Sequence, residues 1–153
     1  MSIHSLKIMY NHNTRKFLRT ASEDWKRSVI AAANYTCFIT GKKHKNNNGV
    51  VLTAHHVGRT FNSIVREAHN NLNIKYHELT TDYASGELNA LLEEIKRLHR
   101  GIEGICLTKE AHDKLHRDYG KHATIDDVRE MRRNYRRMNH DNRNRVYKSK
   151  RSA

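Results

Sequence analysis

Apolar positions recur at helical spacing through much of the chain. The clearest example is a set of four leucines and one isoleucine that recur at three- and four-residue intervals and so share one helical face: Leu88, Leu91, Leu92, Ile95 and Leu98. A capping box, Thr124 with Asp127, marks the start of a later stretch, and Gly120 marks the end of the one before it. The pattern predicts helices over residues 22–33, within 60–100, and over 108–119 and 124–138.

Three short apolar runs have the character of strands instead. Residues 35–39 and 50–54 are rich in β-branched and aromatic side chains and flank a polar, turn-forming loop at 42–49. The third run covers 104–107. The spacing predicts a hairpin between the first two runs. The predicted fold class is therefore α+β, mainly helical with a small antiparallel hairpin.

Composition narrows the range of partners. The 153 residues carry 29 Lys and Arg against 16 Asp and Glu, a net charge of +13. This excess favours a polyanionic partner, with nucleic acid ahead of a membrane surface. No apolar stretch is long enough to span a membrane, and the N-terminus lacks the apolar core of a signal peptide. Two cysteines make no disulfide framework, so we expect a cytoplasmic protein. We also expect a monomer rather than an obligate oligomer.

The charge is concentrated near the two ends. Residues 1–20 contribute +4, residues 129–153 contribute +8, and the middle is almost neutral. This distribution predicts a basic N-terminal arm at 1–21, a domain at 22–139 and a basic C-terminal tail at 140–153. The arms either contact phosphates or are solvated, partly disordered tails.

Two histidine pairs are the candidate chemistry. His55 and His56 are adjacent at a predicted strand end, and His112 and His116 are spaced i, i+4 on one face of a predicted helix. Neutral imidazole is a common metal ligand, so the helical pair can hold one divalent ion. In a chain with 12 histidines, chance placement on the surface is the alternative.

The order of these motifs resembles the HNH endonucleases, and in particular the phage-borne, homing-type group. The similarity covers about residues 22–138 and rests on these segments: Trp25, Tyr35-Thr-Cys37, Thr40-Gly41-Lys42, Leu52-Thr-Ala-His55-His56-Val57, and 104–120 with His112 and His116. The resemblance implies a ββα-metal finger, interrupted here by a helical insertion at about 60–100. It also implies that the chain nicks or cuts double-stranded DNA.

The resemblance assigns roles to the histidines. His56 corresponds to the general base that activates water, and His55, His112 and His116 correspond to metal ligands. We expect a divalent metal, Mg²⁺ first, with Mn²⁺, Ni²⁺ or Zn²⁺ as alternatives. The implied products carry 5′-phosphate and 3′-hydroxyl ends. An unprotonated histidine can take the proton from water near neutral pH, since its ordinary pKa is about 6.5.

Two departures from the family pattern are visible. In the family, a central Asn braces the loop that carries the general base, and this chain has Glu103 at that position. Asn62 either takes the place of that Asn or is an ordinary helix N-cap. Many relatives also carry a structural zinc on four cysteines. At those positions this chain has Cys37, Thr40, Thr108 and Ala111, so we expect no structural zinc.

Basic side chains are the candidate DNA contacts. The loop lysines Lys42 and Lys43 reach phosphates or are simply solvated. The final predicted helix lines up five arginines on a broad face: Arg129, Arg132, Arg133, Arg136 and Arg137. Two other functions stay open, namely a nuclease for phage DNA packaging or host-DNA degradation, and a non-catalytic nucleic-acid-binding module. The DNA target and the choice between nicking and double-strand cleavage are not encoded in any motif.

Overall fold

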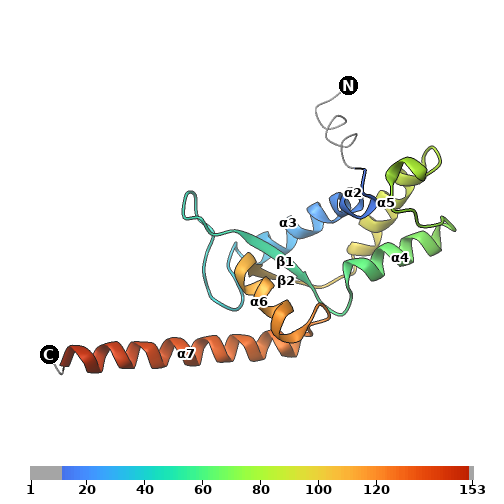
Figure 1. The fold of residues 1–153 in the computed structure, drawn as a ribbon. Coiled ribbons are helices and arrows are strands. Elements are labelled where there is room, and N and C mark those ends of the chain that lie inside the picture. The colour runs from blue at the N-terminus through green and yellow to red at the C-terminus, as the bar shows by residue number, and fades with distance from the viewer. Residues whose placement is uncertain (1–11, 152–153) are drawn as a thin grey trace. The chain divides into compact units, whose positions relative to one another are not determined.

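The computed structural model describes residues 12–151, which form two compact units (Figure 1). Unit 1 comprises residues 12–28 and 59–103, and unit 2 comprises residues 29–58 and 104–151. Each unit is therefore built from two separate stretches of chain. The described chain is mainly helical with one two-stranded antiparallel sheet, as the sequence predicts.

The elements follow in chain order. They are α2 (Thr14–Leu18), the 3-10 helix η1 (Arg19–Ser22), α3 (Glu23–Ala32), β1 (Leu52–His56), α4 (Phe61–Asn71), the 3-10 helix η2 (Thr80–Asp82), α5 (Glu87–His99), β2 (Gly104–Thr108), α6 (Lys109–Tyr119) and α7 (Ile125–Arg151).

Unit 1 is a helical cluster in which α4 and α5 pack on each other and α5 also contacts α2 and η1. Its core includes the fully buried side chains of Leu18, Ile64, Leu91 and Ile95. The predicted helical character of residues 60–100 is confirmed. The described part of the predicted basic N-terminal arm is not a separate arm. Its α2 and η1 contribute buried apolar side chains to this core.

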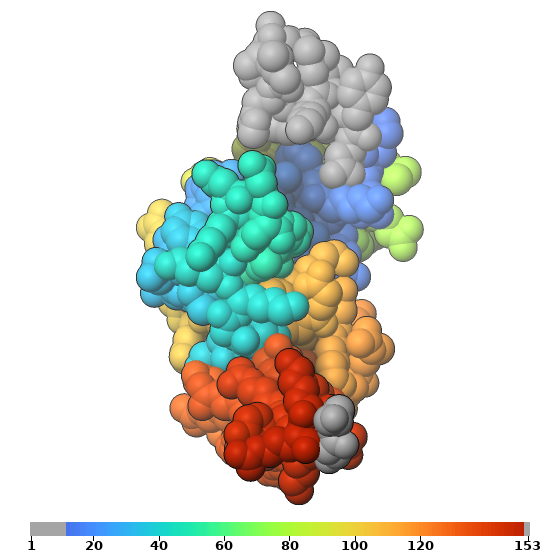
Figure 2. Space-filling view, turned by 90° about the vertical axis from the view of Figure 1, so that its left-hand side faces the viewer, coloured from blue at the N-terminus to red at the C-terminus, as the bar shows by residue number. Residues whose placement is uncertain are grey.

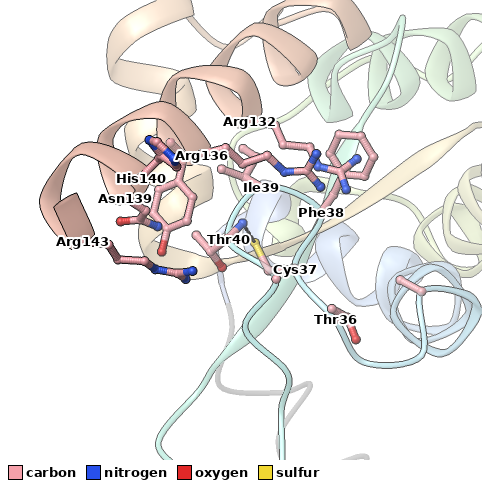
Figure 3. A pocket seen from close by; sticks show the side chains of 13 residues that line it. Thr36, Cys37, Phe38, Ile39, Thr40, Arg132, Arg136, Asn139, His140 and Arg143 are labelled. Carbon is pink, nitrogen blue, oxygen red and sulfur yellow. Dashed lines mark hydrogen bonds between the residues drawn. The ribbon is translucent and has the colours of Figure 1, made fainter. Parts of the chain in front are cut away.

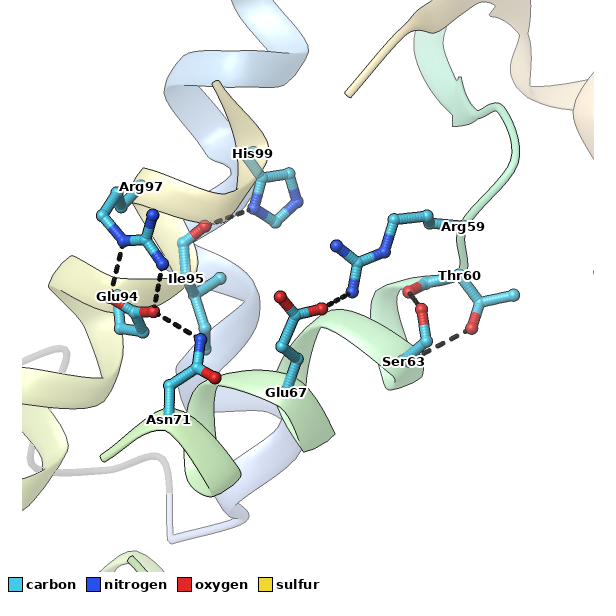
Figure 4. A network of polar contacts seen from close by, with 9 residues as sticks. All are labelled: Arg59, Thr60, Ser63, Glu67, Asn71, Glu94, Ile95, Arg97 and His99. Atoms are coloured by element: carbon cyan, nitrogen blue, oxygen red, sulfur yellow. Dashed lines mark hydrogen bonds and ion pairs between the residues drawn. The ribbon is translucent and has the colours of Figure 1, made fainter. Parts of the chain in front are cut away.

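A polar network joins α4 to α5 on the surface of unit 1 (Figure 4). Asn71 of α4 donates a hydrogen bond to Glu94 of α5, and Arg97 holds the same carboxylate through two more. The hydrogen bonds from Arg97 and then Asn71 lower the pKa of Glu94 to about 2. Glu94 therefore remains ionised over the whole physiological range and links the two helices.

Unit 2 contains the sheet and the two C-terminal helices. β1 and β2 pair antiparallel, with His55 opposite Ile105 and Thr53 opposite Leu107. Ile105 and Leu107 belong to the same buried cluster as Leu115 of α6, and α6 contacts both strands. The helix thus covers the face of the sheet from which His55 projects.

The predicted hairpin between 35–39 and 50–54 is wrong, because the partner of β1 is β2. Asn34 and Tyr35 have left-handed backbones, with φ of 50° and 55°, which end α3 in a tight turn and break an extended run. Residues 36–41 then fold into a loop around Cys37, whose N–H donates to Lys42 and whose carbonyl accepts from Gly41. Phe38 donates its N–H to the Cys106 carbonyl, which ties this loop to β2.

The last helix, α7, is longer than the sequence pattern indicates. Its predicted capping box is present, since Thr124 Oγ1 accepts from the Asp127 N–H and Asp127 accepts from the Thr124 N–H. Residues 140–151, predicted to be a basic tail, continue the helix with exposed side chains, and Figure 2 shows its C-terminal turns in red at the surface. Across residues 12–151, no helix combines the length and apolar character that crossing a bilayer requires.

Candidate metal centre

Three histidines of unit 2 come together at the contact between β1 and α6. β1 supplies His55, and one turn of α6 supplies His112 and His116. One ring nitrogen from each lies within 4.8 Å of the others. The rings of His112 and His116, one helical turn apart, are tilted by 54° to each other, with centroids separated by 4.1 Å. Within the described part of the chain, this is the group of His, Cys, Asp and Glu side chains arranged to hold a metal ion.

The hydrogen bonds of His55 fix which of its nitrogens is a ligand atom. Its Nε2 lies 2.9 Å from the Ala123 carbonyl oxygen, which can only accept, so Nε2 carries the proton. In the neutral ring, Nδ1 then has an unprotonated lone pair. This Nδ1 faces His116 Nε2 across 3.3 Å. A carbonyl that orients a histidine through its second nitrogen is the usual support of a metal ligand.

The spacing and protonation of the cluster fit a small divalent ion. Two nitrogens bound to one tetrahedral ion at about 2.0–2.1 Å lie about 3.3 Å apart, which is the separation of His55 Nδ1 and His116 Nε2. Burial lowers the pKa of His116, and the neighbouring His55 lowers it further, against a smaller opposite effect of Asp113. His116 is therefore neutral at pH 7, as a ligand must be.

His56 follows the first ligand directly. Successive side chains of a strand project from opposite faces, so His56 leaves β1 on the side opposite to His55. Its side chain is half-buried at the end of the strand. His56 is therefore not a fourth ligand on the same face as His55, and its role as general base stays a prediction.

The two candidate bracing residues belong to unit 1. Asn62 is exposed in the first turn of α4, and Glu103 is exposed just before β2. The N-cap of α4 is Thr60, whose side chain accepts from the Ser63 N–H, so the alternative of Asn62 as N-cap is wrong. Whether either residue supports His56 stays a prediction.

The four positions at which the sequence analysis expects no structural zinc, Cys37, Thr40, Thr108 and Ala111, are neighbours in this structure. Cys37 Sγ accepts from the Thr40 N–H at 3.5 Å and lies 3.9 Å from Thr108 Oγ1, and that hydroxyl caps α6 by accepting from the Ala111 N–H. Burial raises the pKa of the Cys37 thiol, but hydrogen bonds from Thr40, Thr108 and Ile39 outweigh it and leave the pKa below its ordinary value. A thiol and two hydroxyls form this contact in place of four thiolates.

The candidate DNA contacts occupy different surroundings. Lys42 and Lys43 are exposed in the loop, and Arg129 pairs with Asp126 at 3.2 Å. Arg132 lies with its guanidinium 4.3 Å above the centre of the Phe38 ring. Three further arginines of the predicted basic face are exposed on α7: Arg133, Arg136 and Arg137.

Two groups that the structure places at candidate sites, the Ala123 carbonyl and Arg143, were not identified from the sequence. The Ala123 carbonyl is a backbone group, and nothing in the sequence marks it as the partner of His55. Arg143 was assigned to the tail, although its spacing of seven residues from Arg136 places both on one face of a continued helix. That periodicity was the available signal.

Comparison of the chain with protein-family models, with curated proteins and with solved structures finds no match.

Proposed function

We propose that the chain is a metal-dependent endonuclease of the HNH type that hydrolyses phosphodiester bonds of double-stranded DNA. The observation that carries the proposal is the cluster of His55, His112 and His116, with His56 adjacent to it on β1. The elements that hold it run in the order strand, strand, helix, which is the order the HNH resemblance implies.

The chain's residues divide the reaction between them. His55, His112 and His116 would hold the ion, which when bound polarises the scissile phosphate and stabilises the charge on the leaving 3′ oxygen. An unprotonated nitrogen of His56 takes the proton from the attacking water. The new bond joins the water oxygen to phosphorus, the bond to the 3′ oxygen breaks, and the ends carry a 5′-phosphate and a 3′-hydroxyl.

The donor set favours a transition metal over Mg²⁺. The cluster offers three imidazole nitrogens, whereas Mg²⁺ prefers carboxylate, carbonyl and water oxygens. Imidazole suits Zn²⁺ and Ni²⁺, and three histidines with one open position form a known arrangement of catalytic zinc. We therefore propose Zn²⁺ or Ni²⁺ as the tightest-bound ion.

Two further features support the proposal. The contact among Cys37, Thr40 and Thr108 involves three of the positions that the HNH resemblance aligns with zinc-binding cysteines, here with one thiol and two hydroxyls. Unit 2 also carries most of the positive charge, with 17 Lys and Arg against seven Asp and Glu. An excess of positive charge on the unit that carries the cluster suits a phosphate-rich substrate.

The test is conversion of supercoiled plasmid to nicked or linear DNA, with and without Zn²⁺, Ni²⁺, Mn²⁺ or Mg²⁺. We expect metal-dependent cleavage that His56→Ala reduces by at least about 100-fold, as removal of a general base typically does, while DNA affinity survives. His122→Ala, an exposed histidine of the same unit, is the matched control. Equal rates for wild type and His56→Ala would remove His56 from the mechanism.

The second candidate function is a non-catalytic nucleic-acid-binding module with a structural metal. Glu103 at the position of the family's bracing Asn favours it, because a carboxylate cannot donate the hydrogen bonds of an amide. If the chain binds plasmid and phage-genome DNA but cleaves neither with any of the four metals, the binding module replaces the endonuclease as the proposed function.

A further inference from the structure

A hollow of about 650 Å³ lies within unit 2, between α7 and the loop at residues 36–41 (Figure 3). Its volume is in the range of sites that bind small molecules or single nucleotide units. The hollow has no part in the metal cluster, since none of the three histidines lines it.

The hollow carries positive charge without compensation. Arg132, Arg136 and Arg143 line it from one face of α7, joined by His140. Among the residues described, the lining includes no Asp or Glu, and none of these three arginines forms an ion pair. By contrast, Arg129 on the same helix is paired with Asp126. An arginine trio without a counter-charge in a concavity is a site for an anion.

Arg132 is held in place before any ligand arrives. Its guanidinium stacks over the Phe38 ring, so the side chain has a defined orientation. Its Nε is buried and, within residues 12–151, has no hydrogen-bond partner. A buried donor without an acceptor is unfavourable in the free protein, so the position of Arg132 is not explained by hydrogen bonds of its own Nε.

The other lining groups point to more than a bare phosphate ion. Thr36, Thr40 and Asn139 offer neutral hydrogen-bonding groups, and Tyr135 offers an aromatic surface. In Figure 3 the arginine side chains extend from α7 toward the loop that carries Phe38 and Thr40. Arginines for a phosphate beside an aromatic ring for a base form the combination that binds unpaired nucleotides, whose bases are free to stack.

We propose that this hollow binds one phosphate with its attached nucleoside from an unpaired nucleic-acid strand, through Arg132, Arg136 and Arg143. This inference goes beyond the proposed cleavage, because binding here requires neither the metal cluster nor His56. A strand seated in the hollow would remain bound to the same unit that holds the cluster.

The test uses the full chain in EDTA, so that no metal-dependent cleavage occurs. Fluorescence anisotropy measures the affinity for labelled (dT)8 and for a duplex of equal length. The variant Arg136→Gln/Arg143→Gln removes two charges from the hollow and spares the stacked Arg132. The matched control, Arg145→Gln/Lys150→Gln, removes two charges from the same helix at positions that do not line the hollow. Circular dichroism melts check that both variants fold.

We expect the hollow variant to weaken (dT)8 binding by at least about 10-fold and the control by no more than about 3-fold, with a smaller salt dependence in the hollow variant. In NMR titrations, dTMP should shift the amides of Thr40 and Gly41, inorganic phosphate should do so more weakly, and thymidine should not. Equal losses in the two variants would overturn the proposal, as would binding of phosphate as tight as dTMP, or the same arginine dependence for duplex. Plasmid cleavage, measured separately, decides the proposed function on its own.

Discussion

Buried histidines occur in both units of the chain, and their ring nitrogens meet different partners in each. In unit 1, His69 and His99 each donate from Nδ1 to the carbonyl four residues earlier in their own helices, and His69 Nε2 contacts the Tyr83 hydroxyl. In unit 2, His55 uses one nitrogen on the Ala123 carbonyl and turns the other toward His116. Burial alone therefore does not identify a ligand histidine; the direction of its second nitrogen does.

The two units differ in charge as well. The described residues of unit 1 have 11 Lys and Arg against nine Asp and Glu, a net charge of +2, whereas those of unit 2 have 17 against seven, a net charge of +10. The acids of unit 1 pair locally, as Glu94 does with Arg97 and Glu67 with Arg59. The metal cluster and the basic hollow both belong to the unit with the excess. If both proposals hold, unit 2 is therefore the unit that contacts ligands.

The largest expected effect separates the two kinds of histidine by metal affinity. His116→Ala removes one of three ligands and should weaken Zn²⁺ or Ni²⁺ binding by more than about 100-fold, the upper range for losing a group that merely orients a ligand. His99→Ala should leave the affinity unchanged. Isothermal titration with each ion measures both. Comparable metal affinity in wild type and His116→Ala would show that His116 is not a ligand and does not differ from His99 in this respect.

The reverse contrast is expected in stability. His99 is 1% exposed and packs against the rings of Trp25 and Phe61. His99→Ala should lower the free energy of unfolding by about 2–4 kcal/mol, as truncation of a large buried ring does. The exposed His12→Ala is the control, with an expected change below about 0.5 kcal/mol. Urea denaturation followed by circular dichroism gives both values, and a change below 1 kcal/mol for His99→Ala would mean that this ring is not a packing element.

The smallest effect is on the pH dependence of stability. Burial lowers the pKa of His99 in the folded chain, the hydrogen bond to Ile95 opposes this, and the charge of Arg59 adds to it. Above the ordinary value of about 6.5, the ring is neutral in both states and contributes nothing. As the pH falls below that value, the unfolded chain binds the proton first, so the free energy of unfolding decreases.

Urea midpoints between pH 7.5 and 5.5 measure this slope, which for one histidine is at most about 1.4 kcal/mol per pH unit. His99→Gln cannot titrate, and its stability should fall less steeply over the same range. A slope unchanged by the substitution would assign the effect to other groups.

Local signals in the sequence predict most of the helices and the shared helical face of His112 and His116. Thr124 with Asp127, and Gly120 after α6, act within a few residues of their own positions, so their effect is readable without tertiary information. The i, i+4 spacing of His112 and His116 is likewise a local property of α6. The link from this pair to His55 followed from a family pattern, which carries long-range information that spacing alone does not.

What the sequence did not predict depends on distant contacts. β1 pairs with β2 rather than with the nearer run at 35–39, because the left-handed residues Asn34 and Tyr35 turn that run into a loop. The stacking of Arg132 on Phe38 joins side chains that are 94 positions apart in the sequence. The hydrophobic periodicity of the two segments does not predict this contact. Phe17, Leu18 and Ala21 were missed as core residues because they sit among charges that looked like an arm.

The pairing of β1 with β2 has a consequence for synthesis on the ribosome. When β1 has been translated, 47 residues separate its last residue, His56, from the first residue of its partner, Gly104. At typical rates of about 5–20 residues per second, that gap lasts roughly 2–10 s. The second stretch of unit 1, residues 59–103, is translated in this interval, while the edge of β1 is still unpaired. The nascent chain therefore contains all of unit 1 before β1, which bears the candidate ligand His55, can pair with β2.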